Sequence, residues 1–494
     1  MSILNGAAES KLDARHQAFM YQIQAFEAVK NLEYSAIFHE QGLGKTKIGI
    51  DLALHWLKSE VVDSVIIVTK RGLIENWTDE LATHTFLKPR IIQQDRRANF
   101  YAFNSPARVY LCHYEVFKSE LERLKLFQQT RKLGVILDES QKIKNPEADL
   151  TKAFFALSSG FVRRSIMTGT PIANRPFDLW SQIYFLDHGT SLGSSFSDFS
   201  DNLELKNSLA GDHDGQARFQ AELGTLFGRI RDFTVRETKL SAGIDLPEKH
   251  IQNLYVDLDY NQRAFYEQIK LHLKADVEKD GVIIEENAED ILKRLLRLVQ
   301  IASNPRLVDD SYLFIPSKYE LLENLLQQAD LAGEKTIIWT NFIGTADWLT
   351  IALKNRGTVV LHGRKSMEQR NAAIAEFKSN NSCRVLVATP ASAKEGLTLT
   401  VANRAIFFDR SFSLDDYLQA QDRIHRISQN SECFVYNLIA RDTVDEWVDM
   451  LLSAKQLAAQ LAQGDIDEST YAGSVNYDFG RVVREILALG GAKS

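Results

Sequence analysis

The feature that most constrains the fold is an alternation of short apolar runs with helical patterns, which occurs twice along the chain. In the first part, five runs each have the character of a buried strand that ends in polar or small residues: SAIFHE, SVIIVTK, RVYLCHY, LGVILDE and RRSIMTGT. Helical patterns such as residues 47–58 and 73–84 separate them. The alternation returns after about residue 317 in EKTIIWTNF, GTVVLHG, CRVLVATP, NRAIFFD and CFVYNLI. Strand–helix–strand repeats of this spacing predict an α/β fold with two parallel sheets and helices on both faces of each.

The stretch between the two alternating parts has a different pattern. Three segments have helical spacing and no clear strand stands among them: GQARFQAELGTLFGRI, NQRAFYEQIKLHLKADVEK and AEDILKRLLRLVQIA. After the second part, VDEWVDMLLSAKQLAAQLAQG predicts a helix and FGRVVREILALG a last short one. We therefore predict four regions: a first α/β lobe at 1–190, a mainly helical insertion and linker at 191–316, a second α/β lobe at 317–450 and a C-terminal helical extension at 451–494.

The composition excludes several classes of protein. No apolar run reaches 18 residues, so no membrane span is expected, and the N-terminus MSILNGAAESKLDARHQ has no signal pattern. Cys112, Cys383 and Cys433 are far apart, which argues against a zinc module or a disulfide framework and fits a reducing cytosol. We expect a cytoplasmic protein, associated with a nucleoid or located in a host cytoplasm if a phage encodes it. The net charge of −7 gives no support for nucleic-acid binding, although a local basic groove would suffice for it.

The stretch HEQGLGKTKIGI follows an apolar run and opens a helical pattern. Within it, Gly42, Gly44, Lys45 and Thr46 form a GxGKT phosphate loop. Glycines let backbone N–H groups surround phosphates, the lysine neutralises the β and γ oxygens, and the threonine hydroxyl can bind Mg²⁺. The alternative is a plain strand-to-helix turn, but the strand and helix on either side favour a site for ATP.

A second apolar run ends in two carboxylates, in the stretch LGVILDESQKIKN. Asp138 would hold Mg²⁺ through water, and Glu139 would orient and deprotonate the attacking water. An isolated Asp-Glu pair is more often a solvated turn. A phosphate loop in the same sheet makes the metal-assisted site the better interpretation. Gln141 stands where many such ATPases carry a histidine.

Two further stretches carry candidate site residues. MTGTPIAN is a third strand end, where the hydroxyls of Thr168 and Thr170 could relay between a nucleotide and a second ligand, or simply form a tight turn. QAQDRIHRISQ places Arg423 and Arg426 three residues apart, on one face of a predicted helix. Such arginines usually make solvated salt bridges. Arginines that reach the γ-phosphate across a cleft instead contribute about 10³–10⁵ in rate, and hydrolysis then depends on closure of the two halves.

Together these stretches resemble the SWI/SNF-type family of superfamily 2 helicase-like ATPases, in particular its minimal bacterial and phage members. The resemblance extends from about residue 21 to about residue 448. It is carried by EQGLGKT, VTKRGLIENWTDEL, LDESQKIKN, MTGTPIAN, VRETK with LPEK, KTIIWTNF, LHGRKSMEQRNAAIAEF, ATPASAKEGLTLTVANRAIFFDRSF and QAQDRIHRISQ. It implies two RecA-like lobes with ATP bound between them.

The resemblance also assigns roles to further residues. Gln22 is the adenine reader, with Gln17 as the alternative, and Gly396 in KEGLTL lies near the nucleotide. Arg423 and Arg426 are the arginines that act across the cleft.

Thr168, Thr170 and Asn174 lie where ATP and DNA are coupled, according to the same resemblance. The replacement of histidine by Gln141 removes no charge that hydrolysis requires. A glutamine amide can donate and accept hydrogen bonds, as a neutral imidazole can.

The function implied is that of an ATP hydrolase, with ATP and Mg²⁺ as cofactors, which translocates along double-stranded DNA and remodels DNA or nucleoprotein. The expected partner is double-stranded DNA, no protein partner is specified, and the protein is expected to be a monomer. Two alternatives remain open. One is a strand-separating or RNA-directed helicase of the same superfamily, and the other is an ATP-gated DNA-binding subunit of a larger complex.

Overall fold

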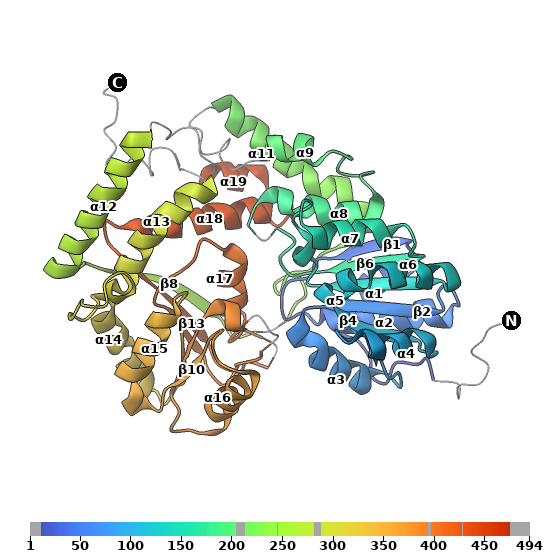
Figure 1. Ribbon diagram of the computed structural model, residues 1–494, viewed down its shortest axis with the longest axis horizontal. Helices are drawn as coiled ribbons and strands as arrows, with labels where there is room; N and C mark the ends of the chain where they lie inside the picture. Colours follow the sequence, from blue (N-terminus) through green and yellow to red (C-terminus); the bar gives the residue numbers. More distant parts are fainter. Residues whose placement is uncertain are drawn as a thin grey trace. The chain divides into compact units, whose positions relative to one another are not determined.

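The computed structural model describes residues 11–172, 174–203, 213–244, 246–280, 288–393, 397–426 and 428–474. The chain forms two compact units (Figure 1), and each is described by itself. The first unit comprises Met1–Glu204, Ala221–Ile244 and Leu461–Asp465. The second comprises Leu205–Gln220, Asp245–Gln460 and Ile466–Ser494.

The first unit contains a seven-stranded sheet in the order β3-β4-β2-β5-β6-β1-β7. Its strands are β1 (Tyr34–Ile37), β2 (Ser64–Thr69), β3 (Arg90–Ile91), β4 (Val109–His113), β5 (Leu133–Asp138), β6 (Arg163–Met167) and β7 (Thr234–Val235). Every pairing between these strands is parallel. The five strands predicted for this part of the chain are confirmed.

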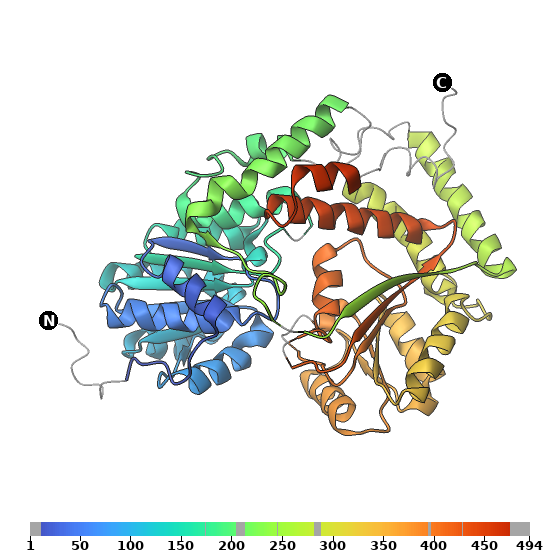
Figure 2. The same cartoon turned by 180° about the vertical axis from the view of Figure 1, so that it is seen from behind.

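Helices cover both faces of this sheet, as the opposite views of Figures 1 and 2 show. The helices of this part of the chain are α1 (Met20–Val29), α2 (Lys45–Lys58), α3 (Ile74–His84), α4 (Arg96–Asn104), α5 (Tyr114–Ser119), α6 (Leu121–Thr130), α7 (Asp149–Ser158), α8 (Trp180–Asp187) and α9 (Phe196–Asn202). Strand side chains alternate between the faces. Val65 and Ile67 of β2 therefore pack in one core with Trp56 of α2 and Trp77 of α3.

The second unit contains a six-stranded parallel sheet in the order β10-β11-β9-β12-β13-β8. Its strands are β8 (Lys249–Val256), β9 (Thr336–Trp339), β10 (Val359–Leu361), β11 (Val385–Ala388), β12 (Arg404–Phe407) and β13 (Cys433–Ala440). Its helices are α12 (Tyr260–Asp280), α13 (Ala288–Ser303), α14 (Lys318–Leu331), α15 (Ile343–Ala352), α16 (Met367–Ser379), α17 (Leu414–Gln421), α18 (Val444–Ala462) and α19 (Glu468–Ser474). The α/β prediction with two parallel sheets is confirmed.

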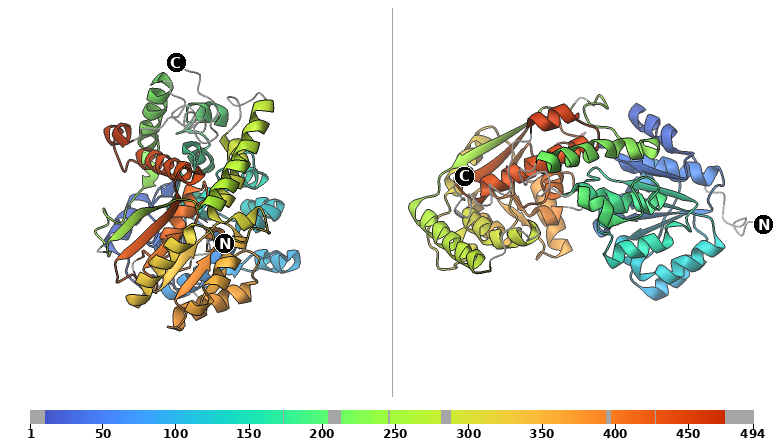
Figure 3. Two further views of the ribbon diagram at one scale, coloured as in Figure 1. Left: turned by 90° about the vertical axis from the view of Figure 1, so that its left-hand side faces the viewer. Right: turned by 90° about the horizontal axis from the view of Figure 1, so that it is seen from above.

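Among its described residues, the stretch 191–316 contains the predicted helices and two strands that the sequence analysis missed, β7 and β8. The helical predictions are confirmed by α11 (His213–Ile230), α12 and α13. The expectation of no strand is wrong at the short β7, which pairs with β1 at the edge of the first sheet. It is also wrong at β8, which pairs with β13 over eight residues at the edge of the second sheet (Figures 2 and 3). As an edge strand, β8 leaves Ile251 and Tyr255 about half exposed, so its sequence KHIQNLYV lacks the continuous apolar run of a central strand.

The predicted helix that begins at Val444 is confirmed as α18, while the last predicted helix, in FGRVVREILALG, lies outside the described residues. Among the helices that the structure describes, none is both long enough and apolar enough to cross a membrane.

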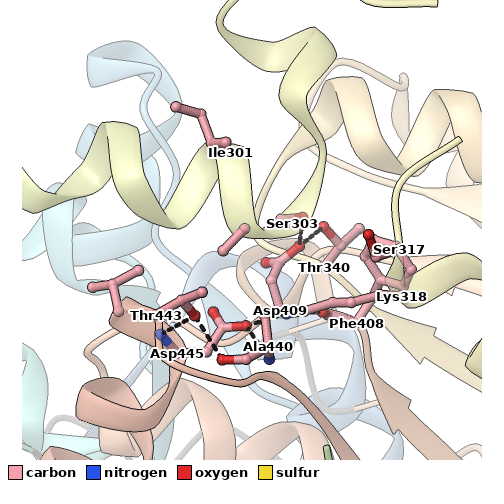
Figure 4. Close-up of polar contacts among 12 residues, drawn as sticks. Ile301, Ser303, Ser317, Lys318, Thr340, Phe408, Asp409, Ala440, Thr443 and Asp445 are labelled. Atoms are coloured by element: carbon pink, nitrogen blue, oxygen red, sulfur yellow. Dashed lines mark hydrogen bonds and ion pairs between the residues drawn. The ribbon is translucent and has the colours of Figure 1, made fainter. Parts of the chain in front are cut away.

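A buried polar junction joins helices to the carboxyl ends of strands in the second unit (Figure 4). Lys318, at the start of α14, forms an ion pair of 2.5 Å with Asp445 of α18, and the Lys318 side chain is fully buried. Close by, the Asp409 carboxylate after β12 accepts hydrogen bonds from Ser303 of α13 (2.7 Å) and Thr340 after β9 (2.5 Å). The junction therefore fixes α13, α14 and α18 against the same edge of the sheet.

Candidate nucleotide site

The phosphate loop connects β1 to α2 and depends on two glycines. Gly42 and Gly44 have φ angles of 87° and 65°, in the left-handed region that glycine adopts without steric cost. A Cβ atom on Gly44 would lie 2.4 Å from Nε2 of Gln22, so a larger residue would displace that side chain and would strain the left-handed backbone. The local geometry thus favours glycine where the sequence predicted a phosphate loop.

Lys45 and Thr46 form the first turn of α2, where backbone N–H groups have no partner within the helix. Nζ of Lys45 donates hydrogen bonds to the carbonyl oxygens of His39 (2.9 Å) and Glu40 (3.2 Å), at the end of β1. The amine is thus held against the start of the loop. A helix N-terminus with an adjacent ammonium group is a favourable site for phosphate.

Gln22 of α1 lies directly against this loop. Its Nε2 donates to the carbonyl oxygens of Leu43 (3.2 Å) and Gly44 (3.4 Å), and its Oε1 accepts from the backbone N–H of Phe19 (3.0 Å). Gln22 is 4% exposed, whereas Gln17 is exposed. The structure therefore brings Gln22 to the loop, and its role as an adenine reader stays a prediction.

Asp138, the last residue of β5, is held by side chains that the sequence analysis did not assign. Its Oδ2 accepts hydrogen bonds from Oγ1 of Thr69 (3.1 Å) and Nε1 of Trp77 (2.8 Å). The hydroxyl of Tyr114 donates to the Asp138 carbonyl oxygen (2.8 Å). Thr69 and Trp77 both belong to VTKRGLIENWTDEL, one of the stretches that carry the family resemblance. That resemblance was the signal in the sequence that could have identified them as site residues.

Glu139 follows in a constrained conformation. Its φ of 57° is left-handed, which is unusual for a residue with a side chain and is associated with functional sites. Its Oε2 accepts from Nζ of Lys70 (2.9 Å) and from Nε2 of Gln141 (2.5 Å). The carboxylate is therefore held by two donors from different strand ends.

The pKa values of the two carboxyls shift in opposite directions. Burial and the neighbouring charge of Glu139 raise the pKa of Asp138. Burial alone would raise the pKa of Glu139 too, but the Lys70 ammonium, with Lys45 and the hydrogen bond from Gln141, lowers it to about 2. Glu139 is therefore ionised at neutral pH, as a base that accepts a proton from water must be.

The turn after β6 lies against both the carboxylates and the phosphate loop. The Thr168 hydroxyl donates to Oε1 of Gln141 (2.7 Å) and accepts from the backbone N–H of Thr170 (3.1 Å). A Cβ atom on Gly169 would lie 3.2 Å from Nζ of Lys45. Gln141 thus connects the Glu139 carboxylate to this turn.

Asn174 lies farther along the same segment. Its backbone N–H donates to the Asp178 carboxylate (3.1 Å), which also accepts from Nζ of Lys144 (3.3 Å). The segment after Thr170 is thereby tied to the residues that follow Glu139.

The second unit contains Arg423 and Arg426, and the prediction that both lie on one face of a helix is wrong. α17 ends at Gln421, so Arg423 and Arg426 lie in the turns that follow it and not on one helical face. After Gln421 the backbone makes i→i−3 hydrogen bonds, from the N–H of Arg423 to the Ala420 carbonyl oxygen and from the N–H of Ile424 to the Gln421 carbonyl oxygen. The Arg423 carbonyl oxygen accepts from the backbone N–H of Leu399.

Both arginines contact the segment that follows Gly396, a residue that itself lies outside the described part of the chain. Nη1 of Arg423 donates to the Leu397 carbonyl oxygen (3.2 Å), and Nη1 of Arg426 donates to the Thr398 hydroxyl (2.9 Å). Arg423 is 3% exposed. The structure thus brings both arginines to the loop predicted to lie near the nucleotide.

Comparison with protein families matches an SNF2-related domain to residues 21–307, which is more than half of the chain. The chain belongs to the SNF2-related family. A second model, the helicase conserved C-terminal domain, matches residues 317–428. The predicted membership of the SWI/SNF-type family is confirmed.

Two curated relatives are longer than this chain. An uncharacterized ATP-dependent helicase of Mycoplasma genitalium is 30% identical over 443 residues, which cover 88% of this chain and 41% of that protein. A putative ATP-dependent helicase/translocase of Bacillus subtilis is 28% identical over 443 residues, covering 86% of this chain and 46% of that one. The chain therefore spans less than half the length of either relative. Among solved structures, the SWI2/SNF2 ATPase core of Sulfolobus solfataricus in complex with dsDNA is similar at 27% identity, with 96% and 97% of the two chains covered and a TM-score of 0.43.

Proposed function

We propose that this SNF2-family protein is an ATP-dependent DNA translocase, which hydrolyses ATP to move along double-stranded DNA and to remodel DNA or nucleoprotein. The observation that carries the proposal is the position of Glu139. This ionised carboxylate is held between Lys70 and Gln141, next to Asp138 and at the same sheet edge as the phosphate loop of Lys45.

In this proposal each residue of the first unit has one task in hydrolysis. Lys45 binds the β- and γ-phosphates, and the backbone N–H groups around Gly42 and Gly44 surround them. Glu139 accepts a proton from the attacking water and so makes it a better nucleophile. Gln22 recognises the adenine.

Mg²⁺ fits the donors present at this site. Thr46 and Asp138 supply hard oxygen atoms and would hold the ion, and the Asp138 carboxylate is oriented by the hydrogen bonds that its Oδ2 accepts from Thr69 and Trp77. No group of three or more metal-binding side chains exists among the described residues. Phosphate oxygens and water would therefore complete the shell, as is usual for Mg²⁺ with nucleotides. Bound there, Mg²⁺ neutralises charge that develops on the phosphates.

The second unit contributes Arg423 and Arg426, which stabilise charge on the γ-phosphate in this proposal, together with the loop at Gly396. Thr168, Thr170 and Asn174 transmit the state of the nucleotide to the bound DNA. The protein acts as a monomer and binds double-stranded DNA mainly through its phosphates, since a translocase must bind every sequence.

The test is ATP turnover by the purified chain with duplex, single-stranded, forked and RNA ligands. We expect duplex DNA to stimulate turnover and DNA affinity to fall steeply with salt, because phosphate contacts release counterions. Displacement of a triplex strand without separation of the duplex identifies translocation. Stimulation by RNA alone, or strand separation on forks, would favour a helicase. Turnover that no DNA stimulates would contradict the proposal.

A further inference from the structure

Lys70 directly follows β2, and the proposed function gives it no task of its own in hydrolysis. β2 and β5 are neighbouring parallel strands, with Val68 opposite Leu137, so the residues after them lie at the same sheet edge. The Lys70 side chain is only 14% exposed, and its Nζ lies 2.9 Å from Oε2 of Glu139. A partly buried ammonium group therefore contacts the carboxylate that is proposed to activate water.

The arrangement of donors around Glu139 is directional. Lys70 and Gln141 both donate to Oε2, one from the end of β2 and one from the 3₁₀ turn after β5. Two donors on one oxygen fix the plane of the carboxylate and leave Oε1 as the acceptor for water. The left-handed backbone at Glu139 further limits where the side chain can point.

We propose that Lys70 is a positioning residue for Glu139, which holds Oε2 so that Oε1 faces the attacking water. This inference rests on the proposed hydrolysis of ATP and adds a residue to that site. A base acts only within hydrogen-bond reach of its proton, and a misplacement of 1 Å can cost about 100-fold in rate. Lysine suits this task because a charged hydrogen bond is about twice as strong as a neutral one.

A purely structural ion pair is the competing explanation. Removing one partner of a buried pair destabilises a protein wherever the pair lies, so loss of activity alone would not separate the two. The positioning role predicts more. It predicts a change in kcat without a change in KM, rescue by arginine, and dependence on the Glu139 carboxylate.

The experiment compares Lys70→Met, Lys70→Gln and Lys70→Arg for ATP turnover with saturating duplex DNA. Lys118→Met is the matched control, because Lys118 forms an exposed ion pair of 3.0 Å with Asp149 on the same unit. We expect Lys70→Met to lower kcat about 10- to 100-fold with KM for ATP within about twofold. Lys70→Gln should fall between it and wild type, Lys70→Arg should recover most of kcat, and Lys118→Met should match wild type.

The double variant Lys70→Met/Glu139→Gln decides whether Lys70 acts through Glu139. We expect its residual turnover, followed with radiolabelled ATP, to equal that of Glu139→Gln alone, because the effects of residues that act as a unit are not additive. An additional 10-fold loss in the double variant, an unchanged kcat in Lys70→Met, or a raised KM with normal kcat would each overturn the inference. Absence of turnover in the wild-type protein would instead refute the proposed function itself. Turnover by the wild-type protein is therefore measured before any variant is made.

Discussion

The side-chain amide of Gln141 donates a hydrogen bond to the Glu139 carboxylate at 2.5 Å. The other end of the same amide accepts from the Thr168 hydroxyl at 2.7 Å. Gln141 therefore bridges the ends of β5 and β6, from the carboxylate proposed to activate water to the turn proposed to couple ATP and DNA. It forms a contact for which histidine is not required, because an amide supplies both a donor and an acceptor.

Substitutions at Gln141 test whether its role is to link Glu139 to Thr168 by hydrogen bonds or whether a residue that can carry a positive charge is needed at this position. Gln141→His keeps a donor and an acceptor, so we expect DNA-stimulated turnover within a few-fold of wild type. Gln141→Leu removes both and should lower stimulated kcat by about 10-fold or more, since Glu139 and Thr168 lose their link. Turnover measured with and without duplex DNA checks both. An inert wild type that Gln141→His activates would show that the site is not functional as it stands.

Lys45→Ala should abolish hydrolysis while DNA binding persists, because the proposed function assigns Lys45 to the phosphates of ATP and not to the DNA. The measurements are ATP turnover and duplex binding by fluorescence anisotropy. Lys58→Ala is the control on the same helix, since Lys58 lies at the end of α2 in an exposed ion pair of 3.1 Å with Asp13. Retained turnover in Lys45→Ala would remove the phosphate loop from the mechanism.

Trp77→Phe should weaken the response to Mg²⁺ with little effect on the fold. The substitution keeps the buried ring but removes the 2.8 Å hydrogen bond to Oδ2 of Asp138. Loss of a partner that orients a metal ligand typically costs about 10- to 100-fold in affinity or activity, so the Mg²⁺ concentration for half-maximal turnover should rise. Trp56→Phe is the control, because that buried indole donates to the Lys30 carbonyl oxygen at 3.3 Å, away from the carboxylates. Equal responses of the two variants would contradict the role of Trp77.

Most strands of the two sheets, and the glycines of the phosphate loop, could be predicted from the sequence. Central strands such as β2 and β5 are buried on both faces, so they appear as continuous apolar runs, and phosphate loops require glycine at fixed positions. β8 lacks such a run because it is an edge strand with two partly exposed faces.

The contacts around the carboxylates could not be predicted in the same way. Trp77 and Lys70 reach Asp138 and Glu139 from positions 61 and 69 residues away in sequence, across two neighbouring strands. Sequence spacing identifies strand ends but not which side chains turn toward one another. The end of α17 at Gln421 was missed for a similar reason, because the segment after it is tied by a backbone hydrogen bond to Leu399, which the local helical pattern does not reveal.

Lys318→Met should destabilise the second unit strongly. The Lys318 amine pairs with Asp445 at 2.5 Å and donates to the Phe408 carbonyl oxygen at 2.9 Å, with no solvent exposure (Figure 4). Leaving one buried charge without its partner costs about 3–5 kcal/mol. Urea unfolding of the variant measures this loss.

Two further variants test the origin of that loss. Lys318→Met/Asp445→Leu should be less destabilised than Lys318→Met, since no buried charge is left alone. Lys335→Met is the control, because the buried Lys335 amine donates to the carbonyl oxygens of Phe377 and Asn380. A double variant as unstable as Lys318→Met would show that packing, and not charge, is responsible.

The stability of the first unit should depend on pH through His39. Burial, reinforced by the positive charges of Lys45 and Arg236, lowers the pKa of His39 from 6.5 to about 3. Between these values the unfolded chain binds a proton at this position and the folded chain does not. The contribution of neutral His39 to the free energy of unfolding is therefore complete above pH 6.5 and is lost as pH falls toward 3, by about 1.4 kcal/mol per pH unit.

His39→Gln cannot titrate at this position, so its free energy of unfolding should fall less than that of wild type between pH 6.5 and pH 4. His16→Gln, at an exposed histidine, serves as the control and should keep the wild-type slope. Identical slopes for His39→Gln and wild type would mean that His39 accepts its proton in the folded state, and that its burial does not keep it neutral.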